Sequence, residues 1–200
     1  FKESILAYAE EKRTIYNIAQ SLGYKPKVSY PASTVLDVFQ TVPATGTGEP
    51  CIKAYNTVKD RPDVLKDHLL SIGHSQGGNA SVHCQYKMQS RYPSVRTISA
   101  ASQPAFSMGW SRYATDIPKI GSPIAVFSGD ADTIVPHAWV NRGVRRMKSE
   151  HYYYQCKPKC THLNSKTWHK SFALAFSNGW LLGDDTAKAI FKGFPDGQYW

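Results

Sequence analysis

The stretch His68-Leu-Leu-Ser-Ile-Gly-His-Ser-Gln-Gly-Gly78 decides the fold expected for this chain. Its first part, residues 68–72, is a short apolar run that predicts a buried strand. Residues 76–90 follow with apolar side chains four residues apart, at Ala80, Cys84 and Met88. This spacing is typical of one face of a helix. A short strand and a helix are therefore joined by a very tight turn, and Ser75 lies in that turn.

The turn has the pattern G-x-S-x-G over residues 73–77, with one further glycine after it. A serine at the tip of such a turn projects its hydroxyl freely, and the backbone N–H of the next residue, Gln76, faces a developing oxyanion. Side chains at positions 73 and 77 would collide in so tight a turn, so we expect glycine at both. The pattern predicts a serine nucleophile; the alternative is a glycine-rich turn with an incidental serine.

Strands and helices alternate along most of the remaining chain. Gly179 falls inside the last expected helix and is predicted to interrupt it. Helices are expected over 3–22, 137–148 and 172–182, and strands over 95–101, 123–128 and 151–156. Such alternation favours parallel strands joined by helical crossovers. The sequence therefore predicts an α/β fold with a mostly parallel sheet flanked by helices.

Residues 1–63 fit this alternation less well and form an atypical or shortened N-terminal segment. The expected catalytic core covers residues 64–200, and the two parts together have the length of one domain. A strand is predicted over 34–42 and a loop over 44–50. Because a second oxyanion donor comes from a loop after an earlier strand, Thr45 is its candidate.

A serine hydroxyl needs a base to take its proton and an acid to orient that base. Asp130 and Asp132 follow the strand expected over 123–128. His162 follows the strand expected over 151–156, and His169 comes slightly later. Either aspartate and either histidine is compatible with this order.

The segment Phe127-Ser-Gly-Asp-Ala-Asp-Thr-Ile-Val-Pro136, taken with the turn around Ser75, resembles the α/β-hydrolase superfamily. In that family a strand runs into Gly-x-x-Asp-x-x-Val-Pro. The resemblance implies that Asp132 is the triad acid and His162 the base, with Asp130 and His169 as their rivals. The short separation between Ser75 and Asp132 leaves little room for a large lid, which is similar to cutinases and small lipid esterases.

The resemblance implies a serine esterase or lipase that cleaves a small-molecule or polymeric carboxylic ester through an acyl-enzyme. It implies no cofactor and no metal. Amidases, peptidases and thioesterases use the same machinery, so the leaving group stays open. Three tryptophans near the predicted site loops are candidates for an apolar pocket or, equally, for the core: Trp110, Trp139 and Trp168.

The formal net charge of +9 raises attraction to anionic surfaces. The basic residues form no single block, and their densest cluster suits the solvated face of a helix or an anion patch: Arg142, Arg145, Arg146 and Lys148. We therefore predict no specific nucleic-acid partner. Two alternatives to an enzyme remain, a polyanion binder and a non-catalytic binding or structural protein with a hydrolase-like fold. No apolar run is long enough to span a bilayer.

Four cysteines, at positions 51, 84, 156 and 160, permit two disulfides, although the pairing cannot be derived from sequence. Cys84 is expected to be buried on its helix. Cys156 and Cys160 bracket Lys-Pro-Lys and would suit a small disulfide-closed loop. A zinc site made of this pair and His162 is the alternative. Disulfides would favour a secreted or extracellular protein.

Overall fold

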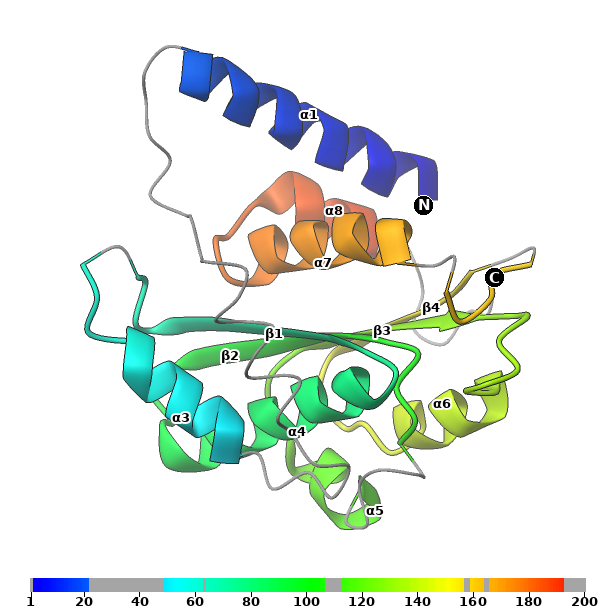
Figure 1. Ribbon diagram of the computed structural model, residues 1–200. Helices are drawn as coiled ribbons and strands as arrows, with labels where there is room; N and C mark the ends of the chain where they lie inside the picture. The colour runs from blue at the N-terminus through cyan, green and yellow to red at the C-terminus, as the bar shows by residue number, and fades with distance from the viewer. Residues whose placement is uncertain are drawn as a thin grey trace.

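The computed structural model describes residues 2–21, 49–62, 64–106, 113–156, 159–163 and 166–192. Along the chain the elements are α1 (Lys2–Ser21), α3 (Glu49–Val58), β1 (His68–His74), α4 (Gln76–Arg91), β2 (Arg96–Ser102), α5 (Tyr113–Asp116), η1 (Ile117–Lys119), β3 (Ile124–Gly129), α6 (His137–Val144), β4 (His151–Cys156), α7 (Lys166–Trp180) and α8 (Asp185–Lys192). The described strands form one parallel sheet in the order β1-β2-β3-β4 (Figure 1). The predicted α/β fold is confirmed.

The register of the sheet aligns the carboxyl ends of the strands. β1 and β2 end together at the pair His74 and Ser102, and β3 and β4 end together at Gly129 and Cys156. Because all four strands run in one direction, the loops that follow them emerge at one edge of the sheet. The candidate site residues follow these four strand ends.

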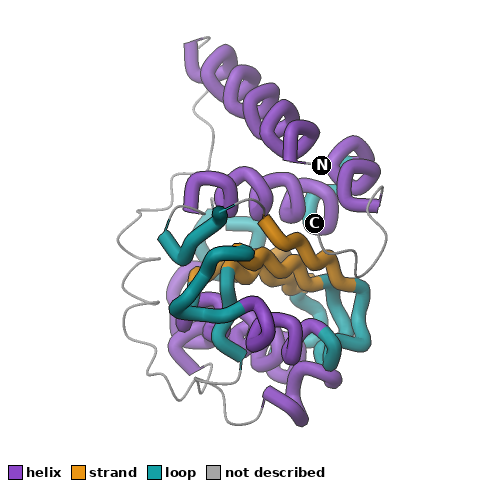
Figure 2. Tube along the Cα trace, turned by 90° about the vertical axis from the view of Figure 1, so that its right-hand side faces the viewer, coloured by secondary structure: helices purple, strands orange, loops and turns teal. Residues whose placement is uncertain are grey.

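Helices cover both faces of the sheet. Figure 1 shows α7, α8 and α1 on one side and α3, α4, α5 and α6 on the other, and Figure 2 shows the strands lying between the two helical layers. In β3, Ala125 and Phe127 belong to the core on the α7 side, whereas Ile124 and Val126 belong to the core on the α4 side. This alternation follows from the two-residue period of a strand, and it explains why β3 is buried along its whole length.

Helix α1 is held to the core by a buried polar contact. The Tyr8 hydroxyl donates a hydrogen bond to Asp184 Oδ2 at 2.6 Å and accepts one from Asn178 Nδ2 at 2.9 Å. Burial, together with the bond to Asp184, raises the pKa of Tyr8 to about 12. The same bond holds the pKa of the Asp184 carboxyl below its usual range. Helix α1 is therefore anchored to α7 and to the residue that precedes α8 (Asp185–Lys192).

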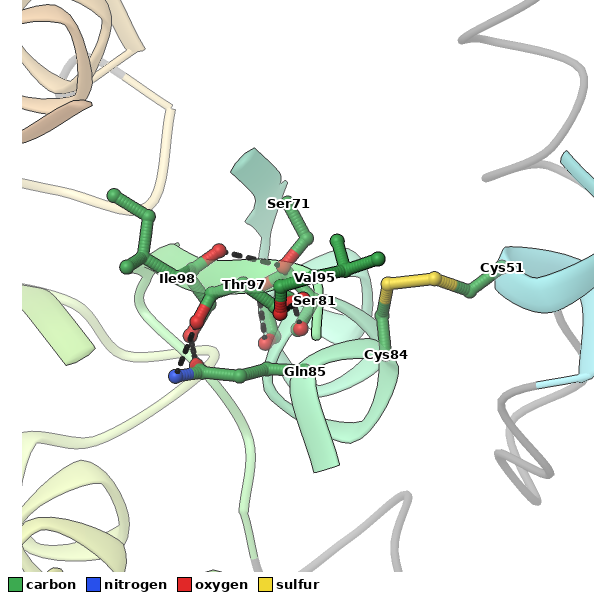
Figure 3. The surroundings of a disulfide bond; sticks show 10 residues. Cys51, Ser71, Ser81, Cys84, Gln85, Val95, Thr97 and Ile98 are labelled. Carbon is green, nitrogen blue, oxygen red and sulfur yellow. Dashed lines mark hydrogen bonds between the residues drawn. A yellow bond between two sulfur atoms is a disulfide. The ribbon is translucent and has the colours of Figure 1, made fainter. Parts of the chain in front are cut away.

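Helix α3 is joined to the core by the disulfide Cys51–Cys84, which links it to α4 (Figure 3). Cys84 is buried on its helix, as predicted. The next residue, Gln85, is fully buried, and its Nε2 donates to the carbonyl oxygens of Ser122 at 3.0 Å and Pro123 at 3.1 Å. Ser99 Oγ donates to Gln85 Oε1. Gln85 thus joins α4 to β2 and to the segment before β3. Both ends of its buried amide have hydrogen-bond partners, as is usual for buried polar groups.

Two helix boundaries differ from the predictions at glycine and proline positions. Helix α7 continues through Gly179, so the predicted interruption is wrong. A Cβ at this position would lie 3.3 Å from the backbone nitrogen of Lys188 in α8. This glycine allows α7 and α8 to pack closely and does not end the helix. Glu49 and Pro50, expected in a loop, begin α3. A proline is tolerated in the first turn because the backbone N–H it lacks has no intrahelical acceptor there.

Helix α6 ends at Val144, earlier than the predicted residue 148. The N–H groups of Arg146 and Met147 bond to carbonyl oxygens three residues earlier, so the chain tightens into turns and Met147 becomes buried. Of the basic cluster, Arg142 alone lies on the helix. Arg145, Arg146 and Lys148 are exposed beyond its end.

Candidate active site

Ser75 occupies the turn between β1 and α4, as predicted from the sequence. Its backbone has φ 58° and ψ −121°, a conformation that a non-glycine residue rarely adopts. The Ser75 N–H donates to the Ser102 carbonyl at 2.8 Å, and the Ser75 carbonyl accepts from Gly78 N–H at 2.9 Å. These bonds hold the strained residue between two strand ends and the first turn of α4. Strain of this kind is concentrated at functional sites.

The glycines of the turn have different roles. A Cβ at Gly73 would lie 1.8 Å from the Gly77 carbonyl oxygen, so the predicted collision there is confirmed. The same prediction for Gly77 is wrong. Apart from its chain neighbours and the backbone of its own helix, no atom of the described residues lies within 4 Å of an added Cβ. Gly78 is the second tight position, since its Cβ would lie 2.9 Å from the Ser102 carbonyl oxygen. Helix α4 therefore packs closely against the end of β2.

Asp132 and His162 are paired. Asp132 lies in the loop after β3, His162 lies in the loop after β4, and Asp132 Oδ2 is 2.7 Å from His162 Nδ1. The other carboxylate oxygen, Oδ1, accepts the backbone N–H groups of Ile134 at 2.9 Å and Val135 at 2.8 Å. Asp132 is buried, so these bonds stabilise its charge and fix its direction.

Asp130 binds the backbone of the histidine-bearing loop. Its Oδ1 accepts the N–H of Cys160 at 2.9 Å, and its Oδ2 accepts the N–H of Lys159 at 3.3 Å. Sequence reasoning treated this residue as the rival acid or as a turn former. In the structure it connects the loop after β3 to the loop after β4.

Two further side chains contact His162. The His74 ring centroid lies 4.5 Å from that of His162, and His74 Nε2 is 2.8 Å from the His162 carbonyl oxygen. Gln103 Oε1 is 2.9 Å from His162 Nδ1. Since His74 immediately precedes Ser75, its contact places His162 beside the turn. Sequence reasoning missed Gln103; its position after a parallel strand, next to the predicted site, was the available signal.

His169 has a different environment from His162. It lies on α7, and burial lowers its pKa to about 4. Among the described residues its Nε2 has no hydrogen-bond partner. The aspartate–histidine pair in this structure is Asp132 with His162, the residues that the resemblance gave as acid and base. The zinc alternative is wrong, because Cys156 and Cys160 are joined in a disulfide.

Some predicted site features lie outside the described residues. These are Thr45, the strand over 34–42, Trp110 and the side chain of Trp168. Trp139 is half-buried on α6. Gln76 is the first residue of α4, so its N–H has no intrahelical acceptor and is available to an anion.

Two disulfides, Cys51–Cys84 and Cys156–Cys160, occur in the structure. The predicted small loop between Cys156 and Cys160 is confirmed. Disulfides persist in oxidising compartments, so the pair fits a secreted or extracellular protein. Within the described part of the chain, no helix combines the length and the apolar character that crossing a bilayer requires.

A comparison with protein-family models finds no match for this chain, and a comparison with curated proteins finds no significant relative.

Proposed function

We propose that this protein is a serine hydrolase that cleaves carboxylic esters, with Ser75 as nucleophile, His162 as general base and Asp132 as the orienting acid. The observation that carries the proposal is the 2.7 Å contact between Asp132 Oδ2 and His162 Nδ1. It occurs at the same sheet edge as Ser75, whose φ of 58° sets it at the tip of the strand-to-helix turn. Acid, base and strained serine are the parts that activate a hydroxyl.

In the proposed reaction, His162 Nε2 takes the Ser75 Oγ proton as Oγ attacks the ester carbonyl carbon. The oxygen of the tetrahedral intermediate accepts the Gln76 N–H, and Thr45 is the proposed second donor. Collapse of the intermediate breaks the ester bond, and the imidazolium returns the proton to the departing alcohol. Water then attacks the acyl-enzyme by the same route, releasing the acid and restoring Ser75.

The surroundings of Asp132 support its proposed role. Its side chain is fully buried, and two backbone N–H groups compensate the carboxylate. A buried carboxylate with such bonds stabilises a neighbouring imidazolium more strongly than a solvated one does. Asp132 is therefore placed to orient the His162 ring and to stabilise an imidazolium through its contact with Nδ1.

The first experiment is hydrolysis of short-chain p-nitrophenyl esters by the wild type and by Ser75→Ala, with fluorophosphonate labelling mapped by mass spectrometry. Ser90→Ala is the matched control, because Ser90 is exposed near the other end of the same helix. We expect hydrolysis and labelling in the wild type and in Ser90→Ala, and neither in Ser75→Ala. A folded wild type without label or hydrolysis would contradict the proposal and favour a non-catalytic protein with a hydrolase-like fold.

We also propose that the protein is secreted, from its two disulfides. Thiol titration of the denatured protein, isolated from its source with free thiols blocked, tests this. All four cysteines should be unreactive, and free thiols would contradict the proposal.

A further inference from the structure

Gln103 is a strained, buried polar residue next to the candidate site. It directly follows β2, it is fully buried, and its φ is 47°. Its backbone N–H donates to the Phe127 carbonyl at 2.6 Å. A glutamine in this backbone conformation is unfavourable, and a buried amide is costly unless it is bonded. Its side-chain contacts supply a reason for its presence.

The amide of Gln103 bridges the histidine-bearing loop. Its Nε2 donates to the Thr161 carbonyl at 3.0 Å, and its Oε1 lies 2.9 Å from His162 Nδ1. Because a carbonyl oxygen only accepts, the amide nitrogen must face Thr161. Oε1 then faces the ring, so Nδ1 must carry the proton. The His162 Nε2 lone pair is left for the Ser75 hydroxyl.

We propose that Gln103 is a positioning residue for His162, which holds the ring in the orientation and tautomer of a general base. This inference rests on the proposed hydrolase function. Asp132 and Gln103 both accept from Nδ1–H, but only Gln103 also binds the backbone next to His162. Asp132 supplies negative charge. Gln103 contacts both the His162 ring and the neighbouring Thr161 carbonyl, so it resists rotation of the ring relative to the loop that carries His162.

The variants Gln103→Met and Gln103→Glu test the role. Methionine has a similar length and no acceptor comparable to the amide, so we expect kcat to fall about 10- to 100-fold while KM changes little. Loss of an acceptor destabilises the imidazolium, so the acidic limb of the pH–rate profile should move to lower pH. Glutamate keeps an acceptor and adds negative charge; its kcat should exceed that of Gln103→Met, and the limb should move to higher pH.

The described titratable side chains facing the His162 ring are Asp132, from the loop after β3, and His74, at the end of β1. Both are present in each variant, so the opposite movements of the limb report on position 103. Gln85→Met is the matched control, because Gln85 is also a fully buried amide bonded to backbone carbonyls. Its partners lie at the start of β2 and just before β3, at the opposite ends of these strands from Gln103 and Asp132. It should lower thermal stability without moving the limb.

A readout that does not need activity is the downfield proton NMR resonance of His162 Nδ1–H, assigned by its loss in His162→Gln. We expect it in the wild type and in Gln85→Met, and broadened by exchange with water in Gln103→Met. An unchanged resonance, or Gln103 variants whose limbs coincide with the wild type, would overturn the inference. If Gln103→Met does not fold, the pH–rate profile of Gln103→Glu tests the inference. An acidic limb at higher pH than in the wild type supports it, and an unchanged limb overturns it. A wild type that neither hydrolyses esters nor takes the label contradicts the hydrolase proposal instead.

Discussion

Gly129 faces the carbonyl oxygen of Cys160 so closely that a Cβ on the glycine would lie 2.1 Å from it. The same carbonyl accepts the Ala131 N–H at 3.2 Å, and Asp130 N–H donates to the Cys156 carbonyl at 3.1 Å. The loops after β3 and β4 are thus in backbone contact. This contact, rather than a long side chain, brings Asp132 within 2.7 Å of His162.

Gly129→Ala is expected to push these two loops apart. The added methyl group meets backbone, which cannot rotate away, so the free energy of unfolding should fall by about 2 kcal/mol. Ester hydrolysis should fall at least ~10-fold, because the aspartate–histidine contact lengthens. Urea denaturation and p-nitrophenyl ester assays check both. Gly121→Ala is the control, since an added Cβ there meets no described atom within 4 Å; full activity in Gly129→Ala would refute the argument.

Asp130→Asn and Asp132→Asn should separate two roles that are adjacent in sequence. Asp132→Asn removes the carboxylate charge that contacts His162 Nδ1 and should lower kcat about 10³- to 10⁴-fold. Asp130→Asn keeps one acceptor for the backbone of Lys159 and Cys160, so the expected loss is about 10-fold. Steady-state kinetics on the same ester measure both. Equal losses would show that the two carboxylates are not divided between base and loop.

The two disulfides should differ in what their removal costs. Cys51–Cys84 closes a separation of 33 residues and Cys156–Cys160 one of 4. In the chain-entropy model their loss lowers the free energy of unfolding by about 4 and about 2 kcal/mol, respectively. The double alanine variants measure this in urea. Removal of Cys156–Cys160, close to His162 in the chain, should also lower kcat, whereas removal of Cys51–Cys84 should not; the reverse pattern would count against the proposed site.

His169 predicts an acid-sensitive stability. Burial lowers its pKa from 6.5 to about 4, so below pH 6.5 the unfolded chain binds a proton that the folded chain does not. Stability present above pH 6.5 is therefore lost as the pH falls toward 4, with about 2 kcal/mol lost between pH 7 and pH 5. His169→Gln, which is neutral throughout, should lose correspondingly less over this range in urea titrations. An identical pH dependence in both proteins would contradict the burial argument.

Local patterns predicted the elements that form the site. The strand before Ser75 and the helix after it are confirmed, because a short apolar run and a four-residue apolar spacing specify them without help from the rest of the chain. The strand over 151–156 is confirmed at the same residues. Prediction was poorer at the ends of α6 and α7. Those ends depend on burial of Met147 and on the contact of Gly179 with α8, both of which are tertiary.

The pairing within the site could not be derived in the same way. Two aspartates lie one residue apart, and two histidines follow the same strand, so spacing alone permitted either member of each pair. Asp130 and Asp132 face different parts of the loop after β4, and this follows from the path of that loop. Gln103 is likewise inconspicuous in sequence and becomes prominent through its contacts with Thr161 and His162.

The sequence by itself determined the α/β class, the parallel strands and the tight turn at Ser75, because apolar periodicity and glycine act over a few residues. Only the tertiary structure decided which aspartate contacts His162, that Gln103 shares this contact, and that Cys51 pairs with Cys84. These features join residues that are distant in the chain, and the register of four parallel strands brings them to one edge of the sheet or across one helix pair.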